Sequence, residues 1–154
     1  MKKFSFRLAK VLELRRKQED SLKETLGNIE EKITNVCNNL DALTRKLTRL
    51  QERLKCLYGD RMTADDILLI QRALSQLRKE IFKEQKLLDS LHRERREISE
   101  ELLEAMKKRK VLEELEDKER IAYKEEIIKC EQKIADEMTA KRFTSEGHVL
   151  KVKI

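Results

Sequence analysis

The sequence predicts an all-α protein, a long antiparallel two-helix coiled-coil hairpin whose second helix overhangs the first. Apolar residues recur at alternating steps of four and three over much of the chain, and a single turn signal interrupts this pattern. Charged residues make up 43% of the 154 residues, against about 25% in an average protein. The chain has no proline, three glycines and 4% aromatic residues. The strands and tight turns of most compact enzyme folds are therefore not expected.

The first helix is expected over residues 5–58. Between Leu22 and Leu57, eleven consecutive positions at steps of four and three are apolar. We call this line of positions the seam, because a repeat of about 3.5 residues requires a partner helix in a left-handed coiled coil. Its members are Leu8, Leu12 and the polar Arg15 and Glu19, then Leu22, Leu26, Ile29, Ile33, Val36, Leu40, Leu43, Leu47, Leu50, Leu54 and Leu57.

A hinge is predicted at residues 59–63. Gly59 is suited to the left-handed conformation that ends many helices. Thr63 can cap a following helix, with Asp66 at the third helical position, as in a capping box. A parallel dimer would also satisfy the first helix, but these turn signals favour a monomeric hairpin.

The second helix is expected over residues 64–142, followed by a flexible tail at 144–154, so that the hairpin occupies residues 1–143. If the chain folds back at the hinge, residue i faces about residue 122 − i, and about 25 residues of the second helix extend past the first. Its apolar seam positions are Ile67, Ile70, Leu74, Leu77, Ile81, Leu88, Leu91, Ile98, Leu102, Ala105 and Leu112, then, in a shifted phase, Tyr123, Ile127, Cys130 and Ile134. Its polar interruptions are Glu84, Arg95, Arg109, Glu116 and Glu119.

No residue pattern indicates catalysis, and no cofactor or metal site is predicted. His92 follows Asp89 by three residues, which places both on one helix face, and a solvated pair is the expected interpretation. The three cysteines, Cys37, Cys56 and Cys130, are expected to be free thiols, because 19 residues of helix between the first two exceed the reach of a disulfide.

Nucleic-acid binding and membrane insertion are also not predicted. The formal charge is +6, but the basic run at 107–110 precedes acidic residues, and no aromatic side chains are interleaved to stack bases. An ion-paired surface is the main interpretation of these cations, and a docking surface for an acidic protein is the second. No apolar run approaches the length of a membrane span, and the N-terminus lacks the apolar core of a secretory signal.

Two groups of residues are candidates for partner binding. The first gathers at the open end of the hairpin, where large apolar residues either seal the seam or form a contact patch. The second lies beside the hinge, where apolar residues off the seam line form either a contact strip or a broader core face. The candidates are Phe4, Phe6, Arg7, Met138, Arg142 and Phe143 at the open end and Leu68, Leu69, Ala73 and Leu77 near the hinge.

The opening residues resemble the N-terminus of the FliJ family, small coiled-coil proteins of the flagellar protein-export apparatus. The resemblance lies in Phe4-x-Phe6-Arg7-Leu8-x-x-Val11-Leu12-x-Leu14-Arg15 with Glu19, in Met62-Thr63, in Gln71 and Leu77, in Gln132-x-x-x-Asp136-Glu137 and in Phe143. The chain length and the short-then-long hairpin agree with it. Similar layouts occur in the counterpart of virulence-type secretion, and a generic coiled-coil scaffold is a further alternative.

The resemblance implies a non-enzymatic stalk, similar to the central stalk of rotary ATPases, that enters the hexameric ring of the export ATPase. It also implies contacts with the cytoplasmic domain of the export-gate membrane protein and with export chaperones. The location implied is cytoplasmic, at the periphery of the inner-membrane export apparatus. Many family members carry Tyr-Gln-Gln-Phe near the tip of the second helix, where this chain has Ile70-Gln71-Arg72-Ala73. Docking of the tip to the gate is therefore the least supported of these implications.

Overall fold

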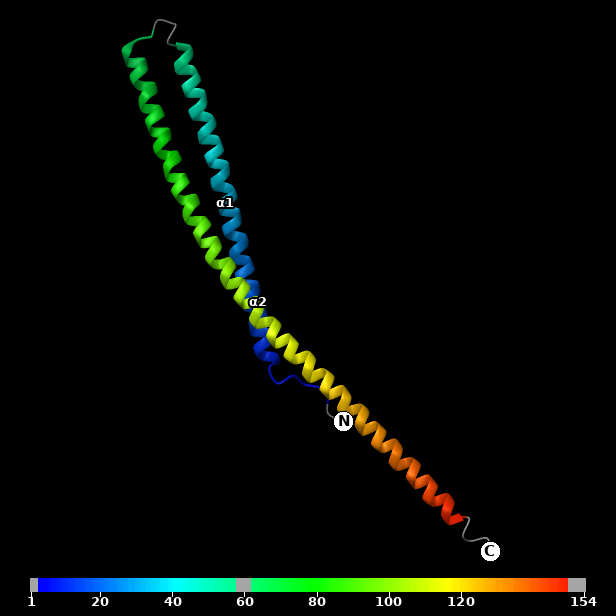
Figure 1. The fold of residues 1–154 in the computed structure, drawn as a ribbon. Helices are drawn as coiled ribbons and strands as arrows, with labels where there is room; N and C mark the ends of the chain where they lie inside the picture. The colour runs from blue at the N-terminus through cyan, green and yellow to red at the C-terminus, as the bar shows by residue number, and fades with distance from the viewer. Residues whose placement is uncertain (1–2, 58–61, 150–154) are drawn as a thin grey trace. The chain divides into compact units, whose positions relative to one another are not determined.

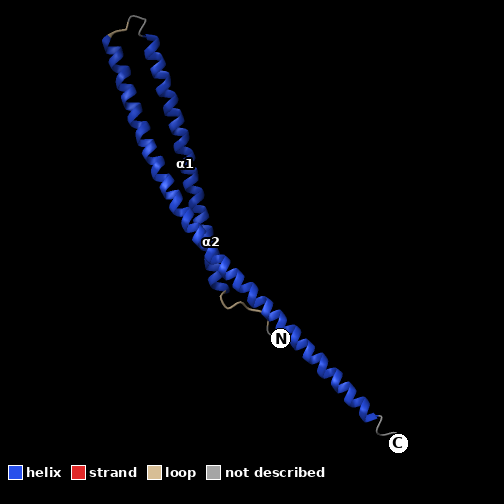
Figure 2. Ribbon diagram, viewed as in Figure 1, coloured by secondary structure: helices blue, strands red, loops and turns tan. Residues whose placement is uncertain are grey.

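The computed structural model describes residues 3–57 and 62–149, with side chains described through residue 144. Two helices account for nearly all of them: α1 over Ala9–Leu57 and α2 over Ala64–Val149 (Figures 1 and 2). The described residues contain no strand. The predicted all-α class with two long packed helices is confirmed. The chain divides into two units, residues 17–106 and residues 1–16 with 107–154.

In the unit of residues 17–106, α1 and α2 run antiparallel and pack along the seam (Figure 1). All eleven apolar positions from Leu22 to Leu57 are buried or half-buried. Ile29 is 2% exposed, and Leu74 and Leu91 of α2 are also buried. Burying such a side chain fully contributes about 1.5–3 kcal/mol, so this repeat supplies the main stabilisation of two otherwise marginal helices.

A capping box begins α2. The hydroxyl of Thr63 donates a hydrogen bond to Oδ2 of Asp66 at 2.7 Å, and the backbone N–H of Asp66 donates to the Thr63 hydroxyl at 3.4 Å. The N–H of Thr63 also donates to the same carboxylate oxygen at 3.4 Å. Asp66 therefore performs the task that glutamate performs in most such caps, as predicted. The other half of the predicted hinge, Gly59, lies outside the described residues.

In the second unit, residues 3–8 precede the helix, and α1 begins at Ala9, four residues later than predicted. Phe6 is 6% exposed, and Phe4 is half-buried. In a helix these two side chains would point about 160° apart. In an extended chain, residues two apart point to the same side, so both rings can pack against one neighbour. We call residues 3–16 the N-terminal anchor.

The N-terminal anchor pairs with α2 in a register that differs from the predicted one. The prediction placed residue 106 opposite Arg16, whereas Arg16 forms an ion pair with Glu113 at 3.1 Å. The start of the first helix was expected to lie opposite residue 118 of α2. Tyr123 and Ile127 are half-buried, so the packing against α2 continues beyond that residue. From Ile128 to Thr144 every residue is exposed, and we call this segment the overhang.

The second helix continues to Val149, where a tail had been predicted from residue 144. A single glycine in a helix costs only about 1 kcal/mol, and no proline is present to stop the helix. The hydroxyl of Thr144 donates a hydrogen bond to the Ala140 carbonyl at 3.1 Å, which is compatible with the helix. Residues 150–154 of the predicted tail lie outside the described residues.

Candidate partner-binding surfaces

The phenylalanines near the N-terminus are packing residues of the N-terminal anchor. The ring centroid of Phe4 lies 5.5 Å from that of Tyr123, and the guanidinium of Arg120 lies 5.8 Å from the Phe4 centroid. Aromatic pairs and cation–π contacts of this kind add about 0.5–1.5 kcal/mol each to the burial of the rings. Of the two interpretations of Phe4 and Phe6, sealing of the seam agrees with their burial, while Arg7 beside them is exposed.

An ion-pair cluster holds the same unit together. Glu113 accepts a hydrogen bond from Arg16 at 3.1 Å and another from Arg109 at 2.6 Å. These bonds lower the pKa of the Glu113 carboxyl below its ordinary value, with Arg16 the larger cause and Arg109 the next. Arg109 is one of the predicted polar interruptions of the seam, so the interruption has a structural role.

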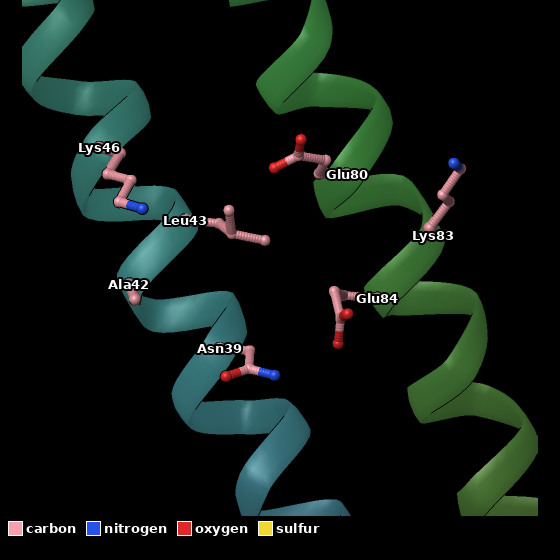
Figure 3. A pocket seen from close by; sticks show the side chains of 7 residues that line it. All are labelled: Asn39, Ala42, Leu43, Lys46, Glu80, Lys83 and Glu84. Atoms are coloured by element: carbon pink, nitrogen blue, oxygen red, sulfur yellow. The ribbon is translucent and has the colours of Figure 1, made fainter.

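Two further carboxylates interrupt the seam within residues 17–106. Glu19 is 4% exposed and forms an ion pair with Lys23 at 2.7 Å. Glu84 is half-buried, and its Oε2 has no hydrogen-bond partner among the described residues. It lines an open groove of about 360 Å³ between α1 and α2, in which Glu80 and Glu84 point toward α1 and Lys83 points away (Figure 3). The groove is lined by Asn39, Ala42, Leu43, Lys46, Glu80, Lys83 and Glu84.

The lining of this groove lacks several side chains that are common at nucleophilic and metal sites. Its lining contains carboxylates, lysines and an amide, but no histidine, cysteine or hydroxyl group that could act as a nucleophile. Across the described part of the chain, no three His, Cys, Asp or Glu residues are close enough to hold a metal ion. The three cysteines are free and exposed.

The hinge candidates divide into two exposed and two partly covered residues. Leu68 is 49% exposed and Leu69 is 63% exposed. Ala73 and Leu77 are half-buried, so they belong to the broader core face of α2. Of these four candidates, only the two leucines offer large apolar surface.

The open-end candidates on α2 all lie in the overhang. Met138 is 58% exposed and Phe143 is 72% exposed. Arg142 is also exposed. Ile128 and Ile134, at 53% and 56%, add to this surface. The overhang therefore presents four large apolar side chains within 17 residues, on a segment where every described side chain is exposed.

Further exposed apolar residues of α2 were not among the predicted candidates. Phe82 is 57% exposed, Leu87 46% and Val111 64%. All three lie off the seam line, so an inspection of the heptad phase for apolar residues outside the seam would have identified them.

Comparison with known proteins gives one decisive finding. The family model described as "Flagellar FliJ protein" matches residues 4–148. The chain belongs to the FliJ family. This confirms the resemblance drawn from the opening residues and identifies a protein related to flagellar export. Neither the curated proteins nor the solved structures contain a significant match.

The FliJ-family match agrees with the helical character of the chain and extends through the overhang to residue 148. Within the described residues, neither helix has a stretch that is both long and apolar enough to cross a lipid bilayer.

Proposed function

We propose that this FliJ-family protein is a non-enzymatic, stalk-like component of the flagellar type III export apparatus. Its overhang would enter the ring of the export ATPase. The observation that carries this proposal is the exposed helix of residues 128–144, with its four large apolar side chains. Large apolar side chains that are exposed together on one short segment are typical of a protein contact.

The distribution of these side chains favours a partner that surrounds the helix. At about 100° per residue, Ile128 and Phe143 lie on one side of α2, and Ile134 and Met138 lie on another. A groove-binding helix presents its apolar anchors along a single stripe. A ring can contact several sides of a rod at once. Oppositely charged residues four apart, such as Glu125 with Lys129 and Glu137 with Lys141, support the helix where no second helix packs.

Further contacts follow from family membership. The exposed Leu68 and Leu69 would meet the cytoplasmic domain of the export-gate membrane protein, and export chaperones would bind the same stalk. The protein would act as a monomer in the cytoplasm, at the periphery of the inner-membrane export apparatus. Its role would be to organise the ATPase and the gate rather than to catalyse a reaction.

ATP hydrolysis by the purified cognate export ATPase tests the central contact. The full-length chain should stimulate hydrolysis, and deletion of residues 138–154 should abolish that stimulation. The helical signal in circular dichroism should fall only in proportion to the length removed. The pair Met138→Ser/Phe143→Ser should weaken stimulation in the same way. The matched control is Leu103→Ser, because Leu103 is similarly exposed, at 56%, but lies outside the overhang. Equal stimulation by all forms would exclude the overhang as the ATPase contact.

A further inference from the structure

The outward face of α2 within residues 17–106 carries a row of cations. Lys79, Lys83 and Lys86 follow steps of four and three, and Arg72 precedes them by seven residues on the same face. All four are exposed, and within the described residues none has an ion-pair partner, although the ammonium of Lys86 lies 4.5 Å from the centroid of the Phe82 ring. At about 100° per residue they stay within about 60° of one another.

The nearest carboxylates of α2 lie off this row. The carboxylates of Glu80 and Glu84 point toward α1, whereas Lys83 points away from it (Figure 3). Asp89 lies about a quarter-turn from the centre of the row. The outward face of α1 differs, because Asp41 and Glu52 are interspersed there with its arginines.

The same face becomes acidic five turns further along α2. Glu97, Glu101 and Glu104 repeat the steps of four and three and are exposed. Each lies 18 residues after the corresponding lysine of the first group, which is five complete turns and about 27 Å. We call these two groups the lysine trio and the glutamate trio.

The separation of basic and acidic residues along this face favours some classes of partner over others. A bilayer of anionic lipid or a nucleic acid is negative along its whole length, so the glutamate trio would oppose its approach. A protein helix can place acidic and basic groups at the same steps on one face, because it shares the geometry of α2. Electrostatic complementarity of this kind determines register and orientation in protein contacts.

A second copy of this chain fits less well than a different protein. In an antiparallel pair of copies, the lysine trio of each copy would face the glutamate trio of the other. Solvent-exposed ion pairs, however, contribute little binding free energy compared with the entropy lost on association. Phe82 and Leu87, exposed beside the lysine trio, would then lie near the glutamate trio of the other copy. A partner that covers these two side chains needs apolar residues beside its carboxylates.

We propose that the outward face of α2 from Lys79 to Glu104 binds a helix of another protein whose charges are segregated in the complementary order. The carboxylates of the partner helix contact the lysine trio, apolar residues beside them cover Phe82 and Leu87, and its cations contact the glutamate trio. This surface uses none of the residues assigned above to the ATPase or the gate.

Fluorescence anisotropy with synthetic helical peptides tests the surface. The matched peptide carries a glutamate trio and a lysine trio five turns apart on one face, with leucines beside the glutamates. The control peptide has the same composition with alternating charges. At low ionic strength the full chain should bind the matched peptide about tenfold more tightly than the control peptide, and the difference should shrink as salt rises.

Charge-reversal variants show which face of the protein binds the matched peptide. Lys79→Glu/Lys83→Glu should weaken binding of the matched peptide about tenfold, whereas Arg45→Glu/Arg49→Glu on the outward face of α1 should leave it unchanged. Both pairs are exposed, and lysine, arginine and glutamate have similar helix propensity, so folding should be preserved. Equal binding of both peptides, or equal binding by the lysine variant, would overturn the proposal.

Exchange of the two trios gives the strictest test. The exchanged chain, with Lys79→Glu, Lys83→Glu, Lys86→Glu, Glu97→Lys, Glu101→Lys and Glu104→Lys, should regain the salt-dependent part of its affinity for the matched peptide and bind it in the reversed direction. The leucines of the peptide then no longer cover Phe82 and Leu87, so the apolar part of the affinity is not regained. Energy transfer from a dye on Cys56, near the end of α1, would report the direction once Cys37 and Cys130 are replaced by serine. Salt-dependent affinity that is not regained, or an unreversed direction, would contradict the proposal. So would a salt-sensitive dimer of the chain alone, or tighter binding to oligothymidylate or phosphatidylglycerol vesicles.

Discussion

The seam from Leu22 to Leu57 and the N-terminal anchor, which contains the seam positions Leu8 and Leu12, join α1 to α2 by different means. Along the seam, eleven apolar positions at regular steps are all at least half-buried. The N-terminal anchor instead relies on Phe6 and Leu12, which are buried, and on the Arg16–Glu113–Arg109 cluster. Regular apolar burial should give cooperative stability, whereas a few anchors and ion pairs should allow local release. The two regions should therefore respond differently to substitution.

A charge in the seam should unfold the packed helices of residues 17–106. Ile29→Asp places a carboxylate at a position that is 2% exposed, and the expected loss is about 5 kcal/mol, through lost burial and an unpaired buried charge. Circular dichroism should show a large fall in melting temperature. The control is Asn28→Asp, because Asn28 is exposed in the same helix turn. A normal melt for Ile29→Asp would mean that the seam does not dominate stability.

Removal of the Phe6 ring should destabilise only the N-terminal anchor. Phe6→Ala should destabilise the packing of the N-terminal anchor by about 3 kcal/mol, without shifting the main melting transition. Amide hydrogen exchange should speed up in residues 9–16 and remain slow in residues 29–43. Phe143→Ala should change neither region, because Phe143 is 72% exposed. A uniform rise in exchange would show that the N-terminal anchor and the seam unfold together.

At one seam position, an apolar substitution should stabilise the protein. Glu84→Leu removes a half-buried carboxylate with an unpartnered oxygen, beside Leu43 in the groove. We expect a gain of about 1–2 kcal/mol in unfolding free energy, because an unsatisfied polar group is replaced by an apolar one. Urea denaturation would measure it. Glu80→Leu is the control, since the Glu80 carboxylate accepts a hydrogen bond from Gln76 at 3.2 Å. A loss on Glu84→Leu would indicate that this carboxylate stabilises the pair.

Periodic and local signals carried most of the fold prediction. The seam of α1 follows from spacing alone, because a heptad repeat defines which side of a helix must be covered. The cap at Thr63 and Asp66 was predictable because it involves residues three apart. Both the helical class and the unequal lengths of the helices follow from these signals.

The parts that sequence reasoning missed depend on contacts distant in the chain. The non-helical start of the N-terminal anchor requires Tyr123 as a neighbour for Phe4, and the register requires the pairing of Arg16 with Glu113. Neither partner can be read from local periodicity. Among the candidate contact residues, the chain itself covers Phe6, Ala73 and Leu77, and only the packed structure separates these from the exposed Leu69 and Phe143.

The smallest expected effect concerns acid sensitivity of the N-terminal anchor. The pKa of Glu113 is lowered in the folded protein, chiefly by the hydrogen bond from Arg16 and then by that from Arg109. Its stabilising contribution is therefore fully present above the ordinary pKa of a carboxyl group and is lost as the pH falls through the lowered value. Because the cluster is partly exposed, the contribution should stay below about 1 kcal/mol.

Amide hydrogen exchange of residues 9–16 across this acidic range measures the effect. The wild-type N-terminal anchor should gain protection as the pH rises and Glu113 ionises, after correction for intrinsic exchange. Glu113→Gln should remove that gain, and Glu114→Gln, at the exposed neighbouring position, should retain it. A pH dependence that survives Glu113→Gln would assign the acid sensitivity to another carboxylate. The ion-pair cluster would then orient Arg16 without contributing to the difference between the N-terminal anchor and the seam.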